Sequence, residues 1–183
     1  MKVMDSFLKS LKPLKEKVGV IMFEFEYLNK DKMPSLEAFF DRLGPFLDEL
    51  PKDHQYSIEI RNPNYIKEEY FDFLKSHKVG HVFIDGYYMP PAYGVFEKFG
   101  KASLPTKTVV VRLLGSDRQG IEKKTRKHWT EVVDPRDKTI EEISDLVKKL
   151  IPEKFDVYAN FNNHLEGSAP QSISKFIRLL EKL

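Results

Sequence analysis

The sequence predicts an α/β fold built on a parallel sheet. Five short stretches rich in apolar, β-branched and aromatic residues alternate with helical patterns, at intervals of about 20 to 45 residues. This alternation is typical of right-handed βαβ units, whose strands run parallel. No linker divides the chain, so residues 1–183 are expected to form a single domain.

Each strand is placed by its run of β-branched and aromatic residues. The strands are expected at Val18–Phe25, Tyr56–Arg61, His81–Asp85, Thr108–Leu114 and Asp156–Phe161. Apolar residues keep helical spacing before the first strand and after the first, second, fourth and fifth strands. These helices are expected within Phe7–Leu14, Leu36–Leu50, Ile66–Leu74, Ile140–Leu150 and Ile173–Leu180.

Local signals mark the ends of some elements. Ser6 is expected to cap the first helix, and Gly44-Pro45 should kink or split the second. Thr139 and Glu142 have capping-box spacing for the fourth-strand helix. After the third strand, the two prolines of Gly86–Pro91 forbid an immediate helix, so a functional loop is expected there.

Composition excludes several classes of protein. With 30 Lys and Arg against 28 Asp and Glu, the net charge of +2 gives no support for binding nucleic acid or an anionic membrane. The chain has no Cys, which excludes disulfides, thiolate metal sites and a cysteine nucleophile. No apolar run approaches the roughly 20 residues of a membrane span, and no signal peptide is evident, so a cytoplasmic location is expected.

The strands differ in polarity between their two sides. One phase of each strand is apolar, as expected for the side that packs on helices, and in the third strand this phase is Val82 and Ile84, opposite Asp85. The other phase turns polar toward the carboxyl end of the strands. Because α/β proteins place active sites at that end, a polar cleft is expected there.

The charged residues of this cleft allow two interpretations. Glu24, Glu59 and Asp85 are candidate general acids or bases, and Arg61 and Arg112 suit a phosphate or a carboxylate. Alternatively, Glu59 with Arg61 and Asp85 with Arg112 are internal ion pairs that order the sheet without any substrate.

Two segments resemble one known family. Ile58–Tyr65 resembles the Glu-x-Arg-His-Pro-x-Trp strand end of the YecE-like family, the domain of unknown function 72, and Phe161–Pro170 resembles its Phe-Asn-Asn-x-x-x-Gly-x-Ala-Pro signature. Phe7–Phe25 and Val109–Gly115 are similar to two further family segments. The resemblance implies a TIM-barrel-like fold and supplies no reaction.

The chain departs from the family pattern at three positions. Asn62 stands where the family usually has His, Tyr65 where it has Trp, and Glu24 near the usual Gln. Any proton transfer by that His is therefore lost here, while Glu24 adds a carboxylate. The residues that we expect to bind a ligand are Arg61, Asn62, Arg112, Gly115, Asn160, Asn162, Asn163, His164, Glu166 and Gly167. Glu166 could equally well cap the following helix.

We weigh two classes of function. The first is an enzyme, a hydrolase or isomerase acting on a small anionic or sugar-like substrate; the second is a non-catalytic binding or scaffold protein that uses the same residues. No metal site is predicted, because the His spacing of known motifs is lacking, and no cofactor is indicated, because P-loop and dinucleotide fingerprints are lacking. The cofactor therefore stays unknown.

The length raises a separate question. A complete TIM barrel takes about 200 to 250 residues in eight units, whereas this chain supplies five. By the resemblance, the missing units are the first three. We expect an open barrel whose two sheet edges are covered by a homodimer partner, by another chain or by rearranged termini.

Overall fold

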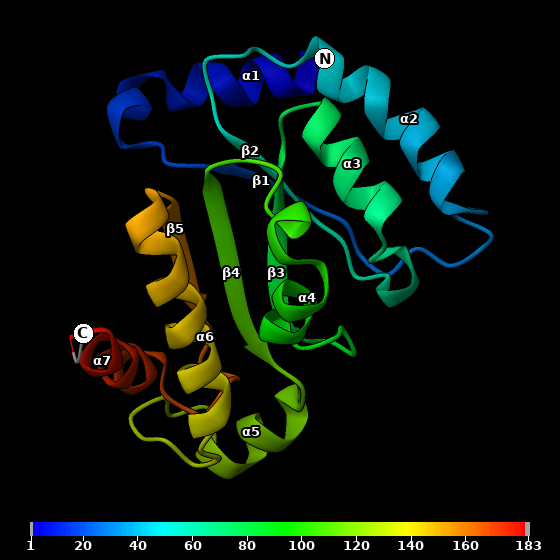
Figure 1. Ribbon diagram of the computed structural model, residues 1–183. Helices are drawn as coiled ribbons and strands as arrows, with labels where there is room; N and C mark the ends of the chain where they lie inside the picture. The colour runs from blue at the N-terminus through cyan, green and yellow to red at the C-terminus, as the bar shows by residue number, and fades with distance from the viewer. Residues whose placement is uncertain (1, 182–183) are drawn as a thin grey trace.

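The computed structural model describes residues 2–181 of the chain (Figure 1). At its centre lies a five-stranded sheet in the order β1-β2-β3-β4-β5, and every neighbouring pair of strands is parallel. The strands are β1 (Ile21–Glu24), β2 (Tyr56–Glu59), β3 (Gly80–Gly86), β4 (Thr108–Gly115) and β5 (Asp156–Phe161). The predicted α/β fold is confirmed. Within the described residues the sheet is open, with β1 and β5 as its edges.

The helices pack mainly on one face of this sheet. They are α1 (Lys2–Leu11), α2 (Leu36–Glu49), α3 (Glu68–Ser76), α4 (Ala92–Phe99), α5 (Arg118–Thr125), α6 (Asp137–Leu150) and α7 (Ala169–Leu180). In Figure 1, α1 lies at the amino end of the strands and α5 at the carboxyl end, beyond the tip of β4. The other face of the sheet, which we call the concave face, carries the polar phase of the strands.

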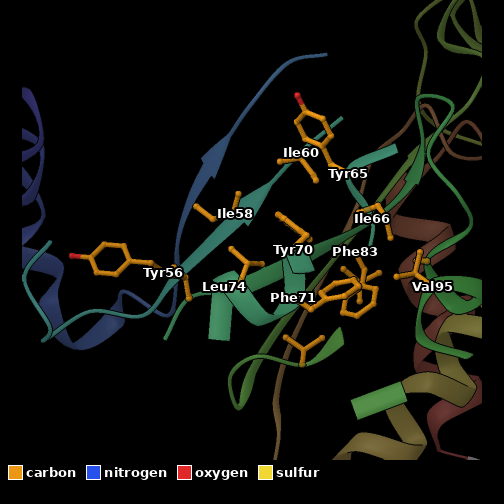
Figure 2. Packing of buried hydrophobic residues seen from close by; sticks show 14 of the residues in the cluster. Tyr56, Ile58, Ile60, Tyr65, Ile66, Tyr70, Phe71, Leu74, Phe83 and Val95 are labelled. Carbon is orange, nitrogen blue, oxygen red and sulfur yellow. The ribbon is translucent and has the colours of Figure 1, made fainter. Parts of the chain in front are cut away.

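The main core lies between the sheet and the helices. Figure 2 shows Ile58 and Phe83 from the strands packed with Tyr70, Phe71 and Leu74 of α3. Each of these side chains is at most 1% exposed. Burying a side chain of this size stabilises the fold by about 1.5 to 3 kcal/mol. This core fixes the strands, and with them the positions of the side chains that end each strand.

Helix α2 runs without a break through Pro45, so the predicted split is wrong. Pro45 cannot donate a backbone hydrogen bond within the helix, which costs about 3 kcal/mol. Against this cost, Phe39, Leu43 and Leu47 are each at most 5% exposed on one face of the helix. Burial of three such side chains outweighs the lost bond.

Two predicted caps are also wrong, and two helices, α4 and α5, were not predicted. Ser6 lies inside α1, where its hydroxyl donates to the Lys2 carbonyl at 3.1 Å. Helix α6 begins at Asp137, so Thr139 is already inside it. Helix α4 begins directly after the two prolines, and α5 lies between the fourth strand and α6, where no helix was expected. The Asp117 side chain caps α5 by accepting a hydrogen bond from the Gly120 N–H at 2.8 Å.

In β3, the side chains that face the helices are the opposite set from the one expected from the sequence. Phe83 belongs to the main core on the helix side, whereas Val82 and Ile84 pack with Val110 and Leu114 in a second cluster on the concave face. Both phases of β3 are apolar over most of the strand, so polarity alone could not assign them. Asp85 consequently shares the helix side with Phe83.

His81, on the same side of β3, is buried among aromatic rings. It is 3% exposed and contacts the rings of Tyr70, Phe71 and Phe83 edge-on, with centroids 4.8 to 5.6 Å apart. Its Nδ1 lies 3.4 Å from the Tyr70 hydroxyl. Burial lowers the pKa of His81 to about 3, because the charged imidazolium would lose its hydration.

The amino half of the concave face is filled by a side chain from the opposite edge. Tyr158 of β5 reaches across to the start of β1, where a Cβ atom on Gly19 would overlap its ring. The sheet is therefore curved enough for its two edge strands to meet through one aromatic side chain.

Candidate functional site

Four charged side chains meet on the concave face at the carboxyl ends of β1, β2 and β4. Glu24 and Glu59 end their strands and are register partners, and Arg61 follows two residues after Glu59. Arg112 extends from β4, two strands away from β2. Because parallel strands end at the same edge of a sheet, residues distant in sequence converge here. We call these four residues the charge cluster.

Both arginines bind both glutamates. The Arg61 Nη2 donates to Glu59 at 3.3 Å and also to Glu24, and the Arg112 Nη1 donates to Glu24 at 2.9 Å and also to Glu59. The two positive and two negative charges balance. Of the two predicted internal ion pairs, Glu59 with Arg61 is therefore present, while Arg112 pairs with the glutamates.

The two glutamates differ in their access to solvent. The Glu59 side chain is completely buried, whereas that of Glu24 is 46% exposed, and those of Arg61 and Arg112 are 22% and 21% exposed. A buried carboxylate is stable only when cations and hydrogen bonds replace its lost hydration. Glu59 is thus the fixed centre of the charge cluster, and Glu24 is its solvent-facing side.

The environment of the charge cluster stabilises the charged forms of Glu24 and Arg112. Partial burial raises the pKa of Glu24, but the hydrogen bonds and positive charges of Arg112 and Arg61 outweigh this and hold its pKa below the ordinary value. Partial burial lowers the pKa of Arg112, and its bonds to Glu59 and Glu24 reverse this and raise the pKa. The arginines keep their full charge at neutral pH.

The loop after β3 covers one arginine. The Arg61 guanidinium carbon lies 4.3 Å from the centre of the Tyr87 ring, a cation–π contact. Tyr87 and Tyr88 both have left-handed backbones, with φ of 51° and 62°. Such angles are strained for bulky residues and are concentrated at functional sites. Tyr88, at the tip, is 95% exposed.

Asp85 does not join the charge cluster. Its side chain lies on the helix side, where it accepts a hydrogen bond from the Ala92 N–H at the start of α4. Burial raises the pKa of Asp85, and the nearby Glu142 adds to this, while the same bond and Arg136 oppose it. The sequence expectation that Asp85 shares one cleft with Glu24 and Glu59, or pairs with Arg112, does not match this position.

Of the predicted asparagines, only Asn160 lies open beside the charge cluster. It is the register partner of Arg112 and is exposed. Asn162 and Asn163 hold the loop before α7: the Oδ1 of Asn162 accepts from the His164 N–H at 2.9 Å, and that of Asn163 from the Ala169 N–H at 2.8 Å.

Asn62 is also committed to backbone contacts. It is 2% exposed, its Oδ1 accepts from the Leu28 N–H at 2.9 Å, and its Nδ2 donates to the Leu28 carbonyl at 2.8 Å. Asn62 therefore ties the segment after β1 to the end of β2. The role of Asn62 is thus structural.

Glu166 neither lies open to a ligand nor caps the first turn of α7, whose Ala169 N–H donates to Asn163 instead. It is completely buried and accepts hydrogen bonds from the Arg136 N–H at 2.6 Å, the Ser172 hydroxyl at 2.6 Å and the Lys175 ammonium at 2.8 Å. These bonds join α7 to the chain before α6. Gly167, with φ of 114°, lies against the backbone of Glu131, where a side chain would not fit.

The sequence reasoning missed a second polar cluster at this end of the sheet. The His164 Nε2 lies 3.1 Å from the Glu122 Oε1, and its ring contacts the edge of Trp129 with centroids 5.1 Å apart. The Arg118 Nε donates to the same Glu122 oxygen at 2.7 Å. The signal that could have revealed this cluster is the Asp117 to Gly120 cap that begins α5.

The backbone links the three loops that follow β3, β4 and β5. A Cβ atom on Gly86 would overlap the Gly115 carbonyl, and one on Gly115 would overlap the His164 carbonyl. Both glycines have positive φ, 129° and 78°. Gly115 is thus required for close approach of the loops and has a structural role.

No three His, Asp or Glu side chains within residues 2–181 gather closely enough to hold a metal ion. In the same part of the chain, no helix is long and apolar enough to cross a membrane.

The fold is similar to solved structures of two bacterial proteins. A DUF72 family protein from Thermotoga maritima MSB8 matches with a TM-score of 0.68 at 17% identity, over 97% of this chain and 64% of that one. One from Enterococcus faecalis V583 matches with a TM-score of 0.64 at 21% identity, over 96% of this chain and 66% of that one. The present chain thus spans slightly less than two thirds of either protein, and at these identities the likeness establishes the fold.

Sequence comparison gives the family directly. No curated protein matches the chain. The family model described as a protein of unknown function, DUF72, matches residues 1–183, the whole sequence. The chain therefore belongs to the DUF72 family.

Proposed function

We propose that the chain binds a small anionic, sugar-like ligand at the charge cluster, with Arg61 and Arg112 as its anchors. The observation that carries this proposal is the contrast between one buried and one half-exposed glutamate. Glu59 holds both guanidinium groups from the buried side, so they stay fixed, while their other side faces solvent through Glu24. Paired guanidinium groups suit carboxylates and phosphates, which accept several charge-assisted hydrogen bonds.

The neighbours of the two arginines favour a ligand that also carries hydroxyl groups. Asn160 is exposed beside Arg112 and offers both an amide donor and an acceptor. Tyr87 holds one side of Arg61, and the exposed Tyr88 follows it in the loop. Aromatic rings at the rim of a polar site commonly pack against the apolar face of a bound ring.

A binding assay tests this proposal. A panel of sugar phosphates and organic acids is titrated into the protein and followed by thermal shift and calorimetry at constant ionic strength. We expect at least one anion to stabilise the wild type, and Arg61→Lys with Arg112→Lys to reduce its affinity at least tenfold, because lysine cannot bind in a bidentate manner. Arg178→Lys, on the exposed side of α7, is the matched control. Stabilisation that is equal in all variants, or absent with every anion, would overturn the proposal.

Catalysis is a second proposal, in which the ligand is the substrate of a hydrolase or isomerase. Its support is that Glu24 offers a carboxylate that solvent reaches, directly beside two arginines. Glu59, bonded to both arginines, suits a positioning role better than proton transfer. Turnover of any ligand found in the binding panel, lost in Glu24→Gln with binding retained, would support an enzyme. Binding without turnover would favour a non-catalytic protein.

We also propose that another polypeptide covers the edges of the sheet. An apolar groove of about 470 Å³ flanks β1 and α2, and one of about 230 Å³ flanks β5, α6 and α7. Ile173 and Ile177 on α7 are exposed apolar side chains as well. Unpaired edges beside apolar surface favour strand pairing. X-ray scattering at several protein concentrations distinguishes a homodimer from a monomer. A stable monomer that binds neither a second copy of itself nor another polypeptide would contradict this proposal.

A further inference from the structure

We propose that Glu24 is a built-in competitor, whose carboxylate occupies the position that the anionic ligand takes between Arg61 and Arg112. This inference rests on the proposed binding function. It starts from the way in which Glu24 is held: one carboxylate oxygen accepts from Arg61 and the other from Arg112. A carboxylate or phosphate that bridges two guanidinium groups makes the same pair of bonds. Glu24 therefore mimics the ligand with a side chain of the protein itself.

Glu24 is also the member of the charge cluster that can leave. It is the last residue of β1, a strand of four residues at the edge of the sheet, and its side chain is half exposed. Rotation of this side chain into solvent restores its hydration. Glu59 has no such alternative, because its side chain is completely buried.

Rotation of Glu24 away from the arginines changes the net charge of the cluster. With Glu24 in place, two guanidinium groups face two carboxylates, and with Glu24 turned away the cluster carries one net positive charge beside solvent. An incoming anion then finds both arginines already positioned by Glu59. The anion must supply enough free energy to replace the bonds of Glu24, so the apparent affinity of every anion is reduced by the same factor.

If Glu24 competes with the ligand, its removal increases the affinity of every anion by the same factor, and this distinguishes competition from a general electrostatic effect. Loss of a nearby negative charge strengthens the binding of a dianion more than that of a monoanion. Loss of a competitor strengthens both equally, because both must displace the same group. A dianion and a monoanion, measured on the same variants, therefore distinguish the two explanations.

Glu26 provides a matched control. It lies two residues after Glu24, is exposed, and pairs with Lys32 and not with the arginines of the charge cluster. Glu24→Gln and Glu26→Gln each remove one negative charge from the same segment. Only Glu24→Gln removes the carboxylate that bridges Arg61 and Arg112.

The experiment measures dissociation constants of sulfate and acetate by calorimetry at constant ionic strength, for the wild type and both variants. We expect Glu24→Gln to bind both anions about tenfold more tightly than the wild type, because a partly exposed, ion-paired competitor is lost. We expect Glu26→Gln to change neither dissociation constant by more than about twofold. Binding that appears only in Glu24→Gln would support the inference equally. Unchanged or weaker binding in Glu24→Gln, or tightening confined to sulfate, would overturn it while leaving the proposed binding function intact. If no protein binds either anion or any member of the panel above, the binding function itself fails.

Discussion

Two glutamates of this protein are completely buried, and each accepts bonds from several donors, yet they lie in very different regions. Glu166 binds a backbone N–H, a serine hydroxyl and a lysine, and joins α7 to the chain before α6. Glu59 binds two arginines that still reach solvent. A buried, paired carboxylate is therefore not by itself the mark of a site. What distinguishes Glu59 is that its partners, Arg61 and Arg112, are also partly exposed to solvent.

The largest expected effect is on the stability contributed by Glu166. Glu166→Gln should lower the free energy of unfolding by about 3 kcal/mol, because the buried amide has one acceptor oxygen for the three donors that Glu166 binds, and Lys175 keeps only its exposed partner Asp137. Denaturation in urea measures the loss. Anion affinity should stay at the wild-type value, since no contact joins Glu166 to the charge cluster among the described residues. A loss of anion affinity in a folded Glu166→Gln protein would break the distinction between the two glutamates.

Glu59→Gln should destabilise less, by about 2 kcal/mol, because solvent still reaches the guanidinium groups that it leaves and Glu24 can pair with both. Unlike Glu166→Gln, it should also weaken the binding of any anion from the panel, since the two arginines lose the group that positions them. Parallel urea and calorimetric titrations of the two variants check both statements. Equal effects of both variants on binding would remove the basis of the comparison.

The acid sensitivity of the fold should come from His81. The pKa of His81 is about 3 in the folded protein, against an ordinary value of 6.5. Between these values the unfolded chain binds one more proton than the folded one, so stability is complete above pH 6.5 and falls as pH decreases, by about 1.4 kcal/mol per pH unit.

Unfolding free energies at pH 7.0, 6.0 and 5.0 test this slope. His81→Leu should abolish most of it, whereas His128→Leu, at an exposed position, should leave it unchanged. A wild-type protein whose stability is flat from pH 7 to 5 would show that His81 is hydrated, contrary to its packing.

The smallest expected effect concerns Asp85, the carboxylate on the opposite face. Burial raises its pKa, so the folded state binds the proton more tightly and stability is lost as pH rises through that pKa. Asp85→Asn keeps an oxygen that can accept from the Ala92 N–H and removes the charge. We expect about 0.5 kcal/mol of stabilisation at pH 7 and none at pH 3. Destabilisation at pH 7 would mean that Arg136 matters more to Asp85 than burial does.

Much of the fold could be predicted from sequence alone, and the four residues of the charge cluster were all expected at the polar ends of the strands. The parallel direction of the strands follows from the alternation of strands and helices, and the parity of β1 and β2 put Glu24 and Glu59 on one side because their opposite phases are apolar. The same rule failed at β3, where both phases are apolar and only the packing of Phe83 against α3 decides the side. The error at Asp85 has this single cause.

Other residues could not be assigned, because sequence does not state what a polar group bonds to. Asn62 and Asn163 occupy a family motif and look like ligand contacts, yet their side chains satisfy backbone groups. Short loops bury backbone donors and acceptors that need partners, and asparagine is the usual supplier. The role of such a residue is known only when its neighbours are known.

The contact of Gly86 with Gly115, and of Gly115 with His164, has a consequence for how this site can diversify. Three consecutive loops touch through main-chain atoms, so exchanging side chains cannot widen or narrow the spacing between them. An inserted residue in any one of these loops would have to displace the other two. Relatives that recognise different molecules are therefore expected to differ on the β1 and β2 side of the rim, where Glu24 ends an edge strand and no glycine stack fixes the backbone.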